Sequence, residues 1–213
     1  MNDRHLSRRG VIAGITLLAA PVARAAPAPL SPADLALAQK GAAYLQGLTS
    51  ARARFIQTDP RGVVSQGEFW LRRPGKLRFQ YDPPSGLIVA SDGRLVSVLN
   101  PRLRSFQNYP LRLTPLSVLL AREIRIGHGF VVSAVTTGPG GFSVAVGGGP
   151  RKYDGRITLD FSRAPISLTG WTITDPQGGE TRVHLVGLHP ASGFDPALFD
   201  LRRPPSWTPA VAG

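Results

Sequence analysis

The residues that could perform catalysis or bind a metal are few in this chain, and they form no known catalytic pattern. After residue 25 the histidines are His128, His184 and His189, which lack the HExxH or paired spacing of a zinc site. Ser143 lies in GGFSVAVG, where Ala145 occupies the position of the second glycine of a nucleophile elbow. The sequence therefore argues against a zinc hydrolase and against a serine esterase.

Residue types that are missing or scattered restrict the chemistry further. The chain has no cysteine, which excludes a disulfide, a thiolate metal site and a thiol nucleophile. Most carboxylates lie in turns and do not form the pair flanking one bond that a glycosidase needs. We therefore expect a protein that is not an enzyme and that uses no metal and no cofactor.

The stretch FWLRRPGKLRFQY, from Phe69 to Tyr81, mixes aromatic and basic residues as a nucleic-acid surface would. A surface that stacks bases needs its aromatic and basic side chains accessible together. Here they alternate, so that Leu77, Phe79 and Tyr81 fall on one face of a strand and the basic residues on the other. The alternation indicates a half-buried strand and argues against a nucleic-acid partner.

Similar alternation predicts an antiparallel sheet through much of the chain. It begins near Ala51 and returns in RITLDF, residues 156–161, and turn signals such as Pro74-Gly75 and Ser91-Asp92-Gly93 separate the strands at short intervals. Successive strands are therefore expected to be hairpin neighbours in one long, curved meander. The predicted class is a mainly β (α+β) fold.

Two or three helices are expected beside this sheet. SPADLALAQKGAAYLQGLTS predicts an amphipathic helix at about 32–48, because Ser31 can cap it and Pro32 suits its first position. LTPLSVLLAREI, residues 113–124, predicts a short and strongly apolar helix that must cover something. GFDPALFDLRRPPSW, residues 193–207, predicts a helical turn at about 196–199 followed by a final edge strand.

Residues 1–25 have the composition of a cleaved export signal. MNDRHLSRRG is a basic head, VIAGITLLAAPV is an apolar run shorter than the roughly 20 residues that span a membrane, and Ala23-Arg24-Ala25 suits cleavage. Ser7-Arg8-Arg9-Gly10-Val11 also fits twin-arginine export, so both export routes stay open. Either route predicts a periplasmic protein, with a spacer at 26–30, a single domain at 31–207 and a loose tail at 208–213.

The charge of the exported chain points to anionic surfaces. Removal of residues 1–25 takes away four arginines and one aspartate, which lowers the formal net charge from +12 to +9. A chain of this charge is attracted to anionic surfaces in general. For an exported protein, phospholipid head groups are the expected surface rather than DNA.

Five segments, taken in order, resemble the outer-membrane lipoprotein carrier protein family. They are ARFIQT, GEFWLRRPGKLRFQYDPP, LIVASDGRLVSVLNP, TPLSVLLA and GFDPALFDLRRP. The resemblance implies an incomplete antiparallel β-barrel, covered by an N-terminal helix and short lid helices, that encloses an apolar cavity for acyl chains. It extends over essentially the whole exported chain.

The resemblance also suggests site residues. In that family the arginine before the proline of this hairpin bonds to the lid, and the matching position here is Arg73, which we expect to latch the lid and couple its closure to cargo release. Cavity candidates follow from the apolar strand face and the helices. They are Leu45, Phe55, Phe69, Leu71, Leu77, Phe79, Ile88, Leu116 and Leu119. The same side chains could equally form an ordinary packed core, because a sequence does not distinguish a filled core from a hollow one.

The leading functional hypothesis is a soluble periplasmic chaperone that acts as a monomer. It would take acylated lipoproteins from an inner-membrane lipoprotein-releasing ABC transporter and pass them to an outer-membrane acceptor or membrane surface. Two alternatives remain. The same fold could carry another lipid or a lipid-linked product, or it could be a non-transporting sensor domain that binds a protein.

Overall fold

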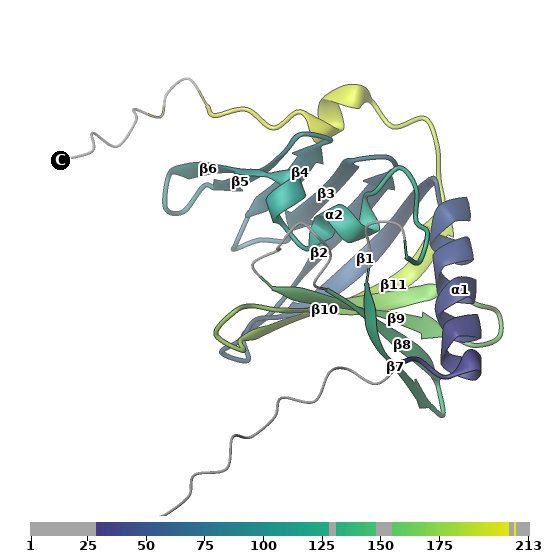
Figure 1. The fold of residues 1–213 in the computed structure, drawn as a ribbon. Helices are drawn as coiled ribbons and strands as arrows, with labels where there is room; N and C mark the ends of the chain where they lie inside the picture. The colour runs from purple at the N-terminus through teal and green to yellow at the C-terminus, as the bar shows by residue number, and fades with distance from the viewer. Residues whose placement is uncertain (1–28, 128–130, 148–154, 205–206, 208–213) are drawn as a thin grey trace, which may run out of the picture.

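A single antiparallel sheet of eleven strands dominates the computed structural model, which describes residues 29–127, 131–147, 155–204 and 207 (Figure 1). The strands lie in the spatial order β6-β5-β4-β3-β2-β1-β11-β10-β9-β8-β7. Their bounds are β1 (Ser50–Thr58), β2 (Val64–Arg72), β3 (Lys76–Tyr81), β4 (Ile88–Asp92), β5 (Leu95–Asn100), β6 (Ser105–Pro110), β7 (Val132–Gly138), β8 (Gly141–Val146), β9 (Arg156–Ser162), β10 (Leu168–Thr174) and β11 (Glu180–Pro190). Within the described residues β6 and β7 are the free edges, so the sheet is an incomplete barrel and the expected fold class is confirmed.

The sheet consists of two meanders rather than the one that was expected. Strands β1 to β6 follow one another outward to one edge, and β7 to β11 return from the other edge until β11 pairs with β1. Because β6 and β7 lie at opposite edges, the chain between them must cross the sheet. This crossing segment, residues 111–127, contains a 3-10 turn, η1 (Leu111–Leu113), and the short helix α2 (Leu116–Leu119). Figure 1 shows α2 in the hollow of the bent sheet, which explains its apolar character.

The N-terminal helix α1 (Pro32–Gly47) confirms the prediction for this region. The Ser31 hydroxyl accepts a hydrogen bond from the Asp34 N–H, and Pro32 begins the helix, so the cap forms as expected. The helix lies against β7, β8 and β10. Its approach depends on Gly41, because a Cβ there would lie only 3.0 Å from the Phe161 ring.

The C-terminal segment differs in part from its prediction. The helical turn η2 (Pro196–Phe199) forms where it was expected, but residues 201–204 form no strand. The segment instead covers the outer face of β3 and β4, where Phe199 is buried and the Leu198 carbonyl accepts a hydrogen bond from Arg78 at 3.0 Å. Prolines at 204 and 205 lack the N–H donors that a strand would need.

Several predictions concern residues outside the described ranges. These are the export signal at 1–25, most of the spacer at 26–30 and the tail at 208–213, and they stay predictions. Among the described residues, no helix combines the length and the apolar character needed to cross a membrane.

The charged residues of the first hairpins lie on the outer face of the sheet. Arg54 contacts the carboxylates of Glu68 and Asp82, with Nη1 to oxygen distances of 3.2 and 3.1 Å, and this contact lowers the pKa of Asp82. Arg52 pairs with Glu68 at 3.1 Å and lies over the Trp70 ring. The apolar side chains of the same strands face the core, so the predicted segregation of the two faces is confirmed.

Candidate functional site

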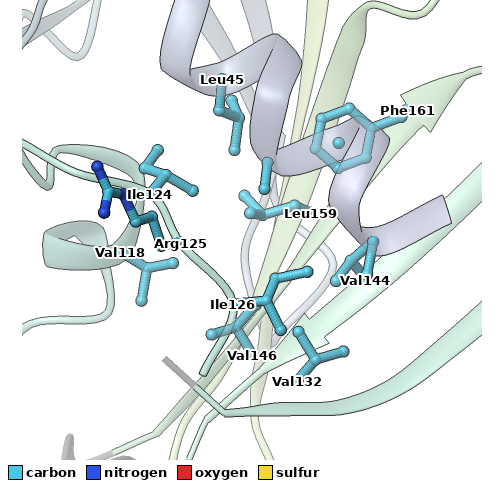
Figure 2. A pocket seen from close by; sticks show the side chains of 13 residues that line it. Leu45, Val118, Ile124, Arg125, Ile126, Val132, Val144, Val146, Leu159 and Phe161 are labelled. Atoms are coloured by element: carbon cyan, nitrogen blue, oxygen red, sulfur yellow. The ribbon is translucent and has the colours of Figure 1, made fainter. Parts of the chain in front are cut away.

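An apolar pocket lies between α1, strands β7 to β9 and the crossing segment (Figure 2). Its empty volume is about 380 Å³, including the part that is open to solvent. Arg125 is the charged residue among those that line it, and Figure 2 shows its guanidinium pointing away from the apolar side chains. The lining residues are Ala38, Gly41, Ala42, Leu45, Val118, Ile124, Arg125, Ile126, Val132, Val144, Val146, Leu159 and Phe161.

The pocket exists because small residues of α1 face aliphatic residues of the sheet. Ala38, Gly41 and Ala42 give the helix little bulk on its inner side. Opposite them, β8 and β9 present alternate apolar residues such as Val144 and Leu159, which are paired neighbours in the sheet. A lining of this kind offers dispersion contacts and excludes water, and it therefore suits a hydrocarbon ligand.

The crossing segment supplies the wall of the pocket that is not part of the sheet or of α1. Val118, Ile124 and Ile126 come from this segment and lie in Figure 2 beside the strand residues. In the described conformation the space is narrow and has room for only a few water molecules. An acyl chain can therefore enter only if the crossing segment moves away from α1 or from the sheet.

The β2–β3 hairpin holds the crossing segment in place. Arg73 Nη2 donates a hydrogen bond to the Ala121 carbonyl at 2.6 Å, and Nη1 donates to the carbonyl of Leu45 in the last turn of α1. The Gly75 N–H donates to the Leu120 carbonyl at 2.9 Å. A cation at the C-terminal end of a helix is also favoured by the helix dipole. Arg73 thus joins the hairpin, the end of α1 and the crossing segment.

The guanidinium of Arg73 loses hydration in this arrangement and does not use all of its hydrogen-bond donors. Burial lowers the pKa of its guanidinium, because the charged form loses hydration. Its Nε atom has no hydrogen-bond partner among the residues that the structure describes. A partly desolvated cation with an unused donor contributes less to closure than a fully bonded one, which is compatible with a contact that opens and closes.

Gln46 forms a second contact between α1 and the crossing segment. Its side-chain amide donates to the Arg122 carbonyl at 3.4 Å and accepts from the Ile124 N–H at 2.9 Å. Sequence reasoning missed this residue. Its two partners are backbone groups of a segment far away in the chain, and no residue pattern marks them.

The predicted cavity residues are only partly in the observed pocket. Leu45 lines it, and Leu116 is half-buried and packs against the core. Six others are buried in the core outside the pocket, where aromatic rings fill the space between the strands. They are Phe55, Phe69, Leu71, Leu77, Phe79 and Leu119.

Ile88 lies on the wrong face for a cavity residue. Val89 is paired with Phe79 and shares its inner face, whereas Ile88 is paired with Gln80 on the outer face. The prediction for Ile88 was therefore wrong. LIVA, residues 87–90, is a continuous apolar run without alternation, so its inner face could not be identified from the sequence.

Of the polar residues that were considered for catalysis, Ser143 and His184 line one open surface pocket together with Asp160. Ser143 Oγ donates to Asp160 Oδ1 at 2.6 Å, so its partner is a carboxylate rather than a histidine. His184 and His189 are exposed on β11, and His128 lies outside the described residues. Among the described residues, no hydrogen bond joins Ser143 to a histidine that could act as its base.

A bent, open antiparallel sheet with an apolar pocket beneath a helix defines a half-barrel suited to hydrophobic ligands. The chain belongs to the family described as "Outer membrane lipoprotein carrier protein LolA", whose model matches residues 46–202. An outer-membrane lipoprotein carrier protein of Chromohalobacter salexigens is 34% identical over 90 residues. That match covers 39% of this chain and 43% of the relative, so it spans less than half of the relative's length.

Solved structures with a similar fold are more distant. A DUF1329 family protein from Desulfovibrio piger has a TM-score of 0.49 at 10% identity, covering 78% of this chain and 95% of that one. A putative outer membrane lipoprotein-sorting protein domain from Vibrio parahaemolyticus has a TM-score of 0.47 at 12% identity, covering 79% and 96%. No function follows from likenesses at this level.

Proposed function

We propose that this protein is a periplasmic carrier that holds the acyl chains of lipoproteins in the apolar pocket and conveys them from the inner to the outer membrane. The observation that carries the proposal is an apolar pocket with one wall, the crossing segment, that only a few hydrogen bonds fasten to α1 and to the β2–β3 hairpin. Membership of the lipoprotein carrier family supports the same cargo.

The energetics of such a wall suit reversible binding. Each methylene that leaves water for the pocket contributes roughly 0.8 kcal/mol. A hydrogen bond in a folded protein contributes about 0.5–1.5 kcal/mol, and one to a charged group about 1.5–3 kcal/mol. Burial of about six to thirteen methylenes therefore offsets the loss of the five bonds made by Arg73, Gln46 and Gly75. When the segment closes again, those bonds form and favour departure of the cargo.

Arg73 has the central role in this cycle. Its guanidinium bonds two carbonyls on opposite sides of the opening, those of Leu45 and Ala121. Opening must separate these two carbonyls, so Arg73 must release at least one of them. We therefore assign to Arg73 the coupling between closure and cargo release.

The carrier acts as a monomer without a cofactor and catalyses no reaction. A lipoprotein-releasing ABC transporter of the inner membrane supplies the cargo, and an acceptor or the surface of the outer membrane receives it. Apart from Arg125 the pocket lining is apolar, so it suits an acyl chain better than the protein part of a lipoprotein. For that reason a carrier of another acylated lipid is the second candidate.

Native mass spectrometry combined with lipid extraction tests the proposal. The protein is expressed from the full chain, purified from the periplasm and analysed without denaturation. A bound acylated lipoprotein is the expected result. Bound phospholipid or another lipid would instead support the second candidate. Absence of any lipid, together with no uptake from lipoprotein-loaded membranes, would contradict both.

A further inference from the structure

The tip of the β5–β6 hairpin presents a leucine to solvent. Leu103 is 74% exposed, more than any other large apolar residue that the structure describes. Figure 1 shows this hairpin projecting beyond β4, on the side of the molecule away from α1. Leu103 lies between two exposed arginines, Arg102 and Arg104. An apolar side chain in this position gains nothing from the core of the protein.

The tip has a defined conformation that holds Leu103 outward. The side-chain carbonyl of Asn100 accepts hydrogen bonds from the backbone N–H groups of Arg102 and Leu103, both at 3.1 Å. The Arg104 N–H donates to the Pro101 carbonyl at 3.4 Å. Because these bonds are local, the exposure of Leu103 is a property of the loop itself.

The backbone at Arg104 has a conformation that disfavours an arginine. Its φ is +48°, in the left-handed region, and among the described residues it is the non-glycine residue with a positive φ. Glycine adopts this conformation more readily than any side-chain-bearing residue. An arginine at this position makes the hairpin less stable than a glycine would, and strained positions of this kind gather at functional sites.

The charged residues near the tip in the sequence are all basic. From Gly93 to Arg122 the chain has five arginines and neither aspartate nor glutamate. Arg102 and Arg104 take part in none of the ion pairs formed among the described residues. The two cations beside Leu103 are therefore available to an anionic partner.

The β1–β2 tip provides a contrast within the same molecule. Val63 and Val64 are 56% and 64% exposed there, so this tip is also apolar. Its arginine, Arg61, pairs with Asp59 at 3.2 Å, and the charge of the tip is locally balanced. Of these two hairpin tips, the β5–β6 tip is the one that combines an exposed apolar residue with unbalanced cations.

We propose that the β5–β6 tip is a membrane-contact site for bilayers that contain anionic phospholipid. Arg102 and Arg104 bind lipid phosphates, since a guanidinium matches the geometry of a phosphate, and Leu103 enters the interfacial region between them. One leucine between two cations offers too little area for a stable protein interface. This site is separate from the pocket, and the inference does not depend on the nature of the cargo.

Vesicle sedimentation tests the site with the purified protein. Vesicles of phosphatidylcholine with phosphatidylglycerol are compared with vesicles of phosphatidylcholine alone, at low and at physiological salt. Binding is expected to the anionic vesicles and to weaken with salt. Replacing Arg102 or Arg104 by glutamine should weaken binding about fivefold for each arginine. Leu103→Ser should weaken it about tenfold.

Two further variants separate binding from folding. Arg104→Gly removes the charge and relieves the backbone, so the protein should be at least as stable and still bind about fivefold more weakly. Val64→Ser alters the β1–β2 tip and should bind as the unchanged protein does. Equal binding to both kinds of vesicle, unchanged binding of Leu103→Ser and Arg104→Gly, or an equal loss in Val64→Ser would each overturn the proposal.

A direct readout of insertion is available because the chain has no cysteine. Leu103→Cys and Val64→Cys each provide one attachment point for an environment-sensitive naphthalene fluorophore. The emission of the label at position 103 should shift to the blue when anionic vesicles are added, and that of the label at position 64 should not. Equal shifts at both positions, or no shift at 103, would contradict entry of Leu103 into the bilayer.

Discussion

The concave face of the sheet has a filled half and a hollow half. In the filled half, formed by β1 to β3 with β10, aromatic rings interlock. The ring centroids of Phe55 and Phe79 lie 5.0 Å apart, those of Phe69 and Phe79 lie 4.9 Å apart, and Trp171 lies 5.8 Å from Phe69. Aromatic pairs at such distances contribute about 0.5–1.5 kcal/mol beyond their buried area. Tyr81 lies beside these rings, and its burial away from water raises the pKa of its hydroxyl to about 12.

The hollow half, between α1 and β7 to β9, is lined mainly by smaller side chains, with Phe161 as its one aromatic lining residue among those described. Ala38, Gly41 and Ala42 on α1 leave space above the valines of β8. The adjoining wall is the crossing segment, which hydrogen bonds of Arg73 and Gln46 hold in place. The difference in side-chain volume therefore separates two tasks, because the filled half stabilises the fold while the hollow half retains space for a ligand.

The largest effect is expected from removal of a ring in the filled half. Phe69→Ala should lower the free energy of unfolding by about 3–5 kcal/mol, because it leaves a cavity among fixed neighbours. Ile126→Ala, in the wall of the hollow half, should cost about 1–2 kcal/mol, since Ile126 is half-buried beside existing space. Urea unfolding measures both. Equal losses would show that the two halves do not differ in their contribution to stability.

An intermediate effect is expected where the hollow half is fastened to the rest of the molecule. Arg73→Leu removes the hydrogen bonds to the carbonyls of Leu45 and Ala121 and should lower the free energy of unfolding by about 1–3 kcal/mol. Amide hydrogen exchange should accelerate in residues 120–126 and remain slow in β1 to β3. In a transfer assay the variant should retain its cargo or deliver it to the wrong membrane.

The neighbouring arginine provides the matched control for this variant. Arg72 is exposed, so Arg72→Leu should leave both amide exchange and cargo transfer unchanged. Normal cargo transfer by Arg73→Leu would refute the coupling assigned to Arg73.

The contact made by Gln46 can be tested in the same way. Gln46→Ala should accelerate amide hydrogen exchange at Ile124, alone or with its neighbours, and should lower the free energy of unfolding by about 1 kcal/mol.

The filled half could be predicted from the sequence better than the hollow half, for a physical reason. Alternation is local, so the inner faces of β2 and β3, with Phe69 and Phe79, followed from residue spacing. The helix α1 followed from its cap. The alternation of RITLDF also placed Leu159 on an apolar face, and extending the cavity argument to that strand would have found part of the pocket.

The remaining features depend on contacts between distant parts of the chain. The crossing from β6 to β7 is set by which strands pair, and the pocket is set by how small residues of α1 meet β8 and β9. Gln46 has no sequence signal, because its partners are the backbone groups of Arg122 and Ile124. The volume left between packed elements is a property of the assembled fold and of no single segment.

The smallest effect on stability, with the clearest effect on binding, is expected from filling the hollow half. Ala42 lines the pocket and is half-buried, so in Ala42→Leu the larger side chain enters existing space and should change the free energy of unfolding by less than about 1 kcal/mol. Uptake of a fluorescent fatty acid should fall at least tenfold, which corresponds to about 1.4 kcal/mol. Ala43→Leu, at an exposed position of the same helix, is the control and should bind as before. If Ala42→Leu binds the probe normally, the ligand does not occupy this pocket, and the filled half would have to open to receive it.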